Sequence, residues 1–97
     1  MFARIVSFQL KSDKLDEAAR FYKENNIPAA KSQKGFNSNY LLIDRKTGKG
    51  ISVAFWDSEE DIIANEASGW WQGQVDKFKD FLTGSVTREV YEVAAQN

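Results

Sequence analysis

The residues that could bind or activate a small molecule are polar groups on the first predicted strand and aromatic rings further along the chain. Ser7 and Gln9 alternate in "SFQL", and either could donate a hydrogen bond to a carbonyl or phenolate oxygen. Tyr22 lies on the apolar stripe of a predicted helix, from which its hydroxyl could reach a pocket. Trp56 could form the wall of a pocket for a flat ligand, and it could equally be an ordinary core residue. Together with a tryptophan pair, the candidate ligand-binding residues are Ser7, Gln9, Tyr22, Trp56, Trp70 and Trp71.

The tryptophan pair points in two directions on any helix, because successive residues are about 100° apart around the axis. On that spacing Trp71 falls on a narrow apolar stripe with Val75, Phe78 and Leu82. We therefore expect Trp71 to belong to the core. Trp70 lies at the edge of the stripe, and we expect it at the rim of a pocket or at the edge of a dimer interface.

Several kinds of chemistry are excluded by residue types that the chain lacks. It has no cysteine and no histidine, which removes thiol nucleophiles, disulfides, Ser-His triads and imidazole metal ligands. The acidic run 57–61 could suggest a metal site, but acids are favoured at a helix N-terminus and we interpret it as capping. We expect no metal and no bound cofactor. No nucleophile–base pair is recognisable either, so the sequence leaves open whether the protein is an enzyme.

Length and charge indicate one domain, residues 1–97, with a net charge of −1 and both signs interspersed. This balance gives no electrostatic reason to bind nucleic acid or an anionic membrane. No apolar run approaches the roughly 18–20 residues of a membrane span. The N-terminal residues lack the pattern of a secretory signal. We therefore expect a soluble, cytoplasmic protein with no nucleic-acid or membrane partner.

The elements that must position the candidate residues alternate between strand and helix patterns. Asp13 could cap the first helix and Pro28 should stop it, while Ser58 should cap the second helical region. A turn at 45–50 joins two of the strands in a hairpin. The order is β-α-β-β-α-β, which predicts an α+β, ferredoxin-like fold with a four-stranded antiparallel sheet. The strands are expected at 2–10, 40–44, 51–56 and 85–95, and the helices at about 14–25, 58–67 and 70–82.

Strand side chains alternate between the two faces of a sheet, and two helices can cover only one face. We expect Ser7, Gln9 and Trp56 on the covered face, although Ser7 could equally bond only to backbone. The opposite set is apolar, and leaving it open would create a large apolar patch of the kind that monomers avoid. Its side chains are aliphatic where an RNA-binding sheet needs stacking aromatics. We therefore predict that it forms a homodimer interface: Val6, Phe8, Ile51, Val53 and Phe55.

A family resemblance is carried by "YLLIDRKTGKGISVAFWDSEED" (40–61) and by "REVYEVA" (88–94). The first is a hairpin with a Thr-Gly-Lys turn and a strand that ends in tryptophan before serine and acidic residues. The second resembles a final strand. The chain resembles the antibiotic biosynthesis monooxygenase-like proteins of the dimeric α+β barrel superfamily over nearly its whole length.

The resemblance implies a dimer and a pocket between helices and sheet for a small apolar or aromatic ligand. It implies a cofactor-independent monooxygenase, or a related enzyme, acting on an aromatic or quinol-type substrate. The alternative is a homodimer that binds a small molecule or another protein without catalysis. In the heme-degrading branch, the family's asparagine, tryptophan and histidine positions fall near Ser7, at Asn65 and at Val75. Because all three differ, we do not expect heme degradation.

Overall fold

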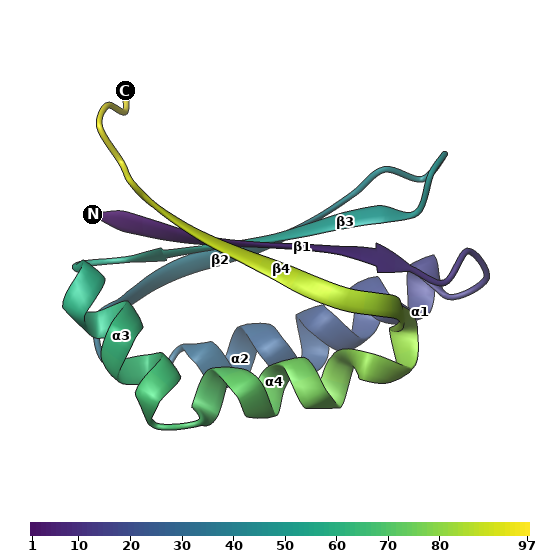
Figure 1. The fold of residues 1–97 in the computed structure, drawn as a ribbon, viewed down its shortest axis with the longest axis horizontal. Coiled ribbons are helices and arrows are strands. Elements are labelled where there is room, and N and C mark those ends of the chain that lie inside the picture. Colours follow the sequence, from purple (N-terminus) through teal and green to yellow (C-terminus); the bar gives the residue numbers. More distant parts are fainter.

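The computed structural model describes residues 1–97 as one antiparallel sheet with helices against one of its faces (Figure 1). The strands lie in the order β2-β3-β1-β4, and every neighbouring pair is antiparallel. Their bounds are β1 Phe2–Leu10, β2 Phe36–Ile43, β3 Lys49–Trp56 and β4 Leu82–Glu92. The predicted ferredoxin-like fold is confirmed.

The helical layer consists of two stretches, one from each half of the chain (Figure 1). The first stretch continues without a break from Leu15 to Ala30. The second is divided at Gly69, which has a φ of 85° and ends one helix directly before the next begins. The elements are α1 Leu15–Phe21, the π-helical turn η1 Tyr22–Asn26, α2 Ile27–Ala30, α3 Glu59–Ala67, α4 Trp70–Phe78 and the 3₁₀ turn η2 Lys79–Phe81.

The prediction that Pro28 ends the first helix was wrong, because a π-turn precedes it. The backbone N–H of Ile27 donates to the carbonyl of Tyr22, five residues back. This widened turn changes the hydrogen-bond register directly before a residue that has no N–H, so the helix continues through the proline. The expected Asp13 cap was also wrong: α1 begins after Lys14, and no side chain caps it.

Two local signals in the second half of the chain are confirmed. Ser58 caps α3, and its Oγ accepts a hydrogen bond from the backbone N–H of Asp61 at 3.1 Å. The β2–β3 hairpin turns where predicted, with the Asp44 carboxylate accepting from the backbone N–H of Lys46 at 2.9 Å. Gly48 follows with a φ of 78°, which few other residues adopt without strain.

The register between β1 and β3 corrects the predicted faces. Directly paired residues share a face, and β1 pairs Val6 with Ser52 and Phe8 with Gly50. Val6 and Phe8 therefore lie on the helix-covered face, where they are buried in the core, and their assignment to the open face was wrong. Ser7 pairs with Ile51. Ser7, with Gln9 two residues on, consequently lies on the open face rather than the covered one.

The core lies between the sheet and the helices. Phe8 contacts Phe78 of α4 edge to face at a ring separation of 5.7 Å. Gly50 leaves the space that the Phe8 ring occupies, since a Cβ at position 50 would overlap that ring. The central cluster comprises Val6, Phe8, Leu10, Ala18, Tyr22, Phe78 and Leu82. None of the helices is both long and apolar enough to cross a membrane.

Candidate functional site

A cavity of about 80 Å³ lies between the sheet and the helices. Its 18 lining residues come from all four strands and from the helical stretches, and 13 of them are hydrophobic. Apolar walls with a few polar groups are the usual character of a small-molecule site, and typical sites are larger than this one, at roughly 300–1,000 Å³. The lining residues whose hydrogen-bonding groups matter below are Arg4, Tyr22, Asn26, Ser52 and Trp56.

All three tryptophans of the chain line this cavity. Trp56 ends β3 and is 1% exposed. Trp70 and Trp71 open α4 and are both half-buried. The pair is therefore explained by one cavity, which both rings reach from adjacent positions.

Arg4 is the central charged group of the site. It lies in the middle of the sheet, and it is 3% exposed. Its Cζ is 5.3 Å from the ring centroid of Trp56 and 5.2 Å from that of Trp71, within the range of cation–π attraction. Two aromatic rings thus replace part of the water that the guanidinium loses on burial.

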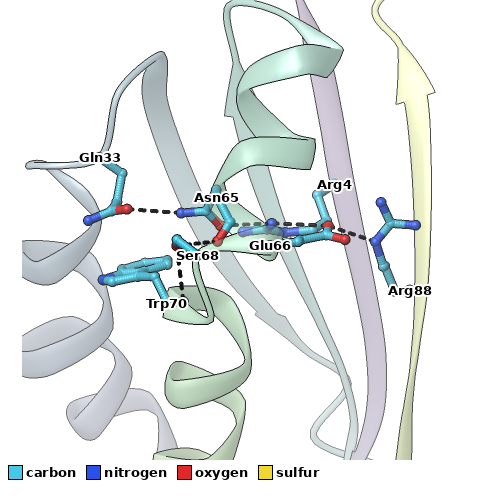
Figure 2. Close-up of polar contacts among 7 residues, drawn as sticks. All are labelled: Arg4, Gln33, Asn65, Glu66, Ser68, Trp70 and Arg88. Carbon is cyan, nitrogen blue, oxygen red and sulfur yellow. Dashed lines mark hydrogen bonds and ion pairs between the residues drawn. The ribbon is translucent and has the colours of Figure 1, made fainter.

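A chain of polar contacts runs from Arg4 through α3 (Figure 2). Nη1 of Arg4 donates to Asn65 Oδ1 at 3.0 Å and to Glu66 Oε2 at 3.2 Å. The same Glu66 oxygen accepts from Nε of Arg88, on β4, at 2.7 Å. Asn65 donates onward to Gln33 Oε1 at 3.0 Å. One carboxylate therefore joins two strands to α3, and it neutralises one of the two arginine charges.

Ser68 connects this chain to the tryptophan pair. Its Oγ donates to the backbone carbonyl of Asn65 at 2.7 Å and accepts from the backbone N–H of Trp70 at 3.2 Å (Figure 2). The start of α4, and with it the position of both indole rings, is therefore linked to the residue that holds Arg4.

The pKa of Arg4 reflects its enclosure. Burial lowers the pKa of the guanidinium, while the hydrogen bond from Arg4 to Glu66 and the charge of that carboxylate raise it. Arginine remains protonated at physiological pH even so. The cavity wall therefore carries a permanent positive charge in apolar surroundings.

Tyr22 reaches strands β2 and β3 from the helical layer. Its hydroxyl lies 2.9 Å from Ser52 Oγ and 3.4 Å from the carbonyl of Tyr40. Burial raises the pKa of this phenol above its ordinary value, and the hydrogen bond to Ser52 partly offsets the rise. Tyr22 is therefore a neutral hydrogen-bonding group at the cavity and not a base.

Two buried polar atoms of the cavity-lining residues have no partner within the chain: the indole Nε1 of Trp56 and Oδ1 of Asn26. Asn26 is the last residue of the π-turn, and its Nδ2 donates to Gln74 Oε1 at 3.3 Å. Unpaired buried groups cost roughly 1–3 kcal/mol each, so such groups are normally bonded to protein or to water.

The structure groups four of the six candidate residues around the cavity: Tyr22, Trp56, Trp70 and Trp71. Ser7 and Gln9 are not among the lining residues. The amide of exposed Gln9, on β1, donates to the carbonyl of Thr47 in the β2–β3 turn at 2.7 Å. Of the positions implied by the heme-degrading branch, Asn65 holds Arg4, Val75 lines the cavity and Ser7 lies on the other face.

Sequence reasoning did not predict the roles of Arg4, Asn26 and Asn65 at the cavity. One signal for Arg4 was available, since it is the single charged residue alternating with Val6, Phe8 and Leu10 along one face of its strand. No comparable signal marked Asn65, because its role depends on where α3 docks.

No protein-family model matches the chain. Two curated relatives match part of it: the uncharacterized proteins MT2634 and Rv2557 of Mycobacterium tuberculosis, from strains CDC 1551/Oshkosh and H37Rv. Each is 34% identical over 62 residues, which is 64% of this chain and 28% of the relative. The chain thus matches little more than a quarter of the length of these relatives.

Solved structures match over nearly the whole chain. A monooxygenase from the gene ActVA-Orf6 of Streptomyces coelicolor, in complex with nanaomycin D, has a TM-score of 0.81 at 13% identity, covering 99% of this chain and 89% of that one. The heme-degrader MhuD of Mycobacterium tuberculosis, with two hemes bound, has a TM-score of 0.80 at 14% identity, covering 100% and 99%. A putative antibiotic biosynthesis monooxygenase from Nitrosomonas europaea has a TM-score of 0.75 at 17% identity, covering 98% and 100%. Identities of this size show the fold alone. This chain has the fold of the antibiotic biosynthesis monooxygenase-like proteins, as the sequence resemblance implied.

Proposed function

We propose that the chain binds a small aromatic, quinol-type molecule in the cavity and oxidises it as a cofactor-independent monooxygenase. The observation that carries this proposal is the wall of the cavity, which is lined by three tryptophan rings, two of them packed against the buried, permanently charged Arg4. Flat indole surfaces favour a flat ligand, and a positive charge favours an electron-rich, anionic one. A structural neighbour was solved in complex with nanaomycin D, which is consistent with ligand binding in this fold.

In this type of reaction the substrate supplies the electrons. An anthrone-type methylene releases a proton to water, and the resulting anion transfers one electron to O₂, giving a substrate radical and superoxide. These two combine and take up a proton to form a hydroperoxide, which loses water to leave a carbonyl, so that CH₂ and O₂ become C=O and H₂O. The chain's own residues would bind the ring, exclude water and stabilise the anion, for which Arg4 supplies charge and Tyr22 a hydrogen bond.

Heme degradation is not part of this proposal. The position that the resemblance gives to the iron ligand holds Val75, and the chain has no histidine elsewhere to replace it.

A homodimer through the open sheet face accompanies the proposed function. With the register corrected, this face carries Ile51, Val53 and Phe55 of β3 beside Tyr40 and Leu42 of β2. Tyr40 and Leu42 are 54% and 51% exposed, an arrangement that a second copy of the chain would cover. A dimer that only binds small molecules or other proteins would use the same surfaces without any catalysis, and it is the alternative function.

The experiment is a two-part measurement on the same protein. Because every tryptophan lines the cavity, intrinsic fluorescence should report binding of dihydroxynaphthalene- and anthrone-type compounds. An oxygen electrode then tests turnover. Binding with oxygen uptake supports the monooxygenase, whereas binding without uptake across the panel selects the non-catalytic alternative. If no compound changes the tryptophan emission, the cavity is not an aromatic-ligand site.

A further inference from the structure

We propose that the ligand of the cavity is an organic anion, whose charged oxygen binds the unused edge of the Arg4 guanidinium. The oxygen belongs to an acidic enol, phenol or carboxylic acid attached to the ring. This inference rests on the proposed function and deepens it, because it separates acidic aromatic compounds from neutral ones of the same shape.

The first argument is the number of donors that Arg4 has to spare. A guanidinium has five N–H groups, of which two are on Nη1. Nη1 makes both hydrogen bonds of the side chain within the protein, to Asn65 and Glu66. The three donors on Nε and Nη2 have no partner in the chain, although Arg4 lines the cavity and is 3% exposed. Neither Nε nor Nη2 is among the fully enclosed unpaired atoms, so both keep some accessible surface, and the two donors on one edge match a carboxylate or an enolate oxygen.

The second argument is the sum of charges in the cluster. Arg4 and Arg88 share a single carboxylate oxygen of Glu66, which leaves one positive charge among the three side chains. The side chains of Arg88 and Glu66 are 37% and 22% exposed, whereas that of Arg4 is only 4% exposed. Tyr22, the other titratable group near Arg4, is neutral. An anion in the cavity would therefore meet an uncompensated cation in surroundings of low polarity, where attraction is strongest.

A third observation is independent of Arg4. The indole Nε1 of Trp56 is enclosed without a partner, in the same ring against which the guanidinium packs. This donor belongs to a ring that lines the cavity next to the guanidinium, although the nitrogen itself is enclosed. N–H donors suit an oxygen that carries negative charge, whereas the unpaired acceptor among the lining residues, Asn26 Oδ1, would suit a protonated group of the same ligand.

Asn65 and Glu66 act on this subsite as positioning residues. They hold one nitrogen of Arg4 from α3, while the Trp56 and Trp71 rings pack against the guanidinium. The planar group is thereby held in place before a ligand arrives, which reduces the entropy cost of binding.

The test compares two probes that differ in charge and hardly in shape. 2-Hydroxy-1,4-naphthoquinone is an acidic enol and is anionic at neutral pH, and its 2-methoxy ether is neutral. Calorimetric titration of the unmodified protein should give an affinity at least about tenfold higher for the hydroxy compound, the effect of one charged hydrogen bond. Lowering the pH below the pKa of the free hydroxy compound should remove most of that preference.

Variants then identify the residue responsible. Arg4→Met should bring the ratio of the two affinities close to one, whereas Arg4→Lys, which keeps the charge, should retain an intermediate ratio. Arg20→Met removes a charge from an exposed position of α1 and should leave the ratio unchanged. Arg4→Lys and the comparison of probes on the unmodified protein decide the question even where Arg4→Met fails to fold.

The outcomes separate this inference from the proposed function. Equal affinity for the two quinones in the unmodified protein, or an unchanged ratio in Arg4→Met, overturns the anion subsite while leaving an aromatic-binding cavity. Failure of both quinones to bind overturns the proposed function and the inference together.

Discussion

The two faces of the sheet reverse the usual distribution of polar and apolar groups. On the helix-covered face an arginine is 3% exposed and is held by a buried asparagine. On the open face, Tyr40, Leu42 and Tyr91 are each more than half exposed. Buried charge is expensive, and exposed aromatic or aliphatic side chains in a group invite association. The comparison indicates that neither face is optimised for the stability of an isolated chain: one suits a ligand, and the other suits a partner.

The largest effect should come from a charge on the open face. Val53→Lys places two like charges across the proposed two-fold interface, and such pairs cost several kcal/mol. We expect the dimer to weaken about a thousandfold, or about 4 kcal/mol, and to appear as a monomer by light scattering at micromolar concentration. Ile63→Lys, at an exposed position on α3, is the matched control and should leave the mass unchanged. A Val53→Lys protein that remains dimeric would show that the interface lies elsewhere.

On the covered face, Glu66→Gln should destabilise the fold by about 2–3 kcal/mol, because it leaves the enclosed Arg4 without its counter-charge. This destabilisation is smaller than that expected for breaking a fully buried ion pair, because Glu66 retains some access to water. Chemical denaturation measures the change. Glu60→Gln, at an exposed position of the same helix, should cost little. Equal stability of the two variants would contradict a central role for the Arg4–Glu66 pair.

A smaller effect should follow from filling the space opposite Phe8. Gly50→Ala puts a Cβ against the Phe8 ring and should cost about 1–3 kcal/mol through overpacking. The same substitution at Gly73, within α4 and with no atom nearby, should instead stabilise the chain by about 0.5–1 kcal/mol. Thermal unfolding should show a lower melting temperature for Gly50→Ala and a higher one for Gly73→Ala. A Gly50→Ala protein of unchanged stability would show that Phe8 is less tightly enclosed than described.

The smallest effect concerns Tyr22. Tyr22→Phe should lower the free energy of unfolding by about 1 kcal/mol, because it removes the hydroxyl that bonds Ser52. Tyr91→Phe, on the open face, is the control and should leave the stability nearly unchanged. Burial raises the pKa of Tyr22, so the folded chain holds this proton to higher pH than the unfolded chain does. The contribution of the Tyr22 hydroxyl to the free energy of unfolding is therefore complete below the ordinary pKa of 10.0, and it falls as the pH rises above that value. Unfolding curves on both sides of that pH check this, and a pH-independent difference from Tyr22→Phe would contradict it.

Local patterns predicted the elements well, because their causes lie within a few residues. The Ser58 cap and the Asp44–Gly48 turn depend on neighbours in the chain, and both were found. The π-turn before Pro28 was missed, since a helix that continues through a proline depends on a backbone shift with no sequence signature.

The faces were harder to predict, because they depend on register between distant strands. The alternation of side chains divides each strand into two sets of residues, one for each face of the sheet. A shift of the strand pairing by one residue exchanges the faces of the two sets. β1 and β3 are separated by a helical stretch and a further strand, so no tight turn fixes their pairing. A usable clue was present in β3, where Gly50, Ser52 and Ala54 are small. Small residues opposite Phe8, Val6 and Arg4 leave room for those side chains and for a cavity.

The buried arginine also bears on how the chain reaches its native state. The partners of Arg4 on α3 are 61 and 62 residues away in sequence. A fragment containing β1 to β3 alone could cover the Arg4 face only by desolvating a charge that has no counter-ion. Packing of the first half alone therefore gains little free energy. Docking of α3 supplies the counter-ion of Arg4, so both halves of the chain become stable in the same step. Folding of this chain should consequently be cooperative across its whole length, without a stable N-terminal intermediate.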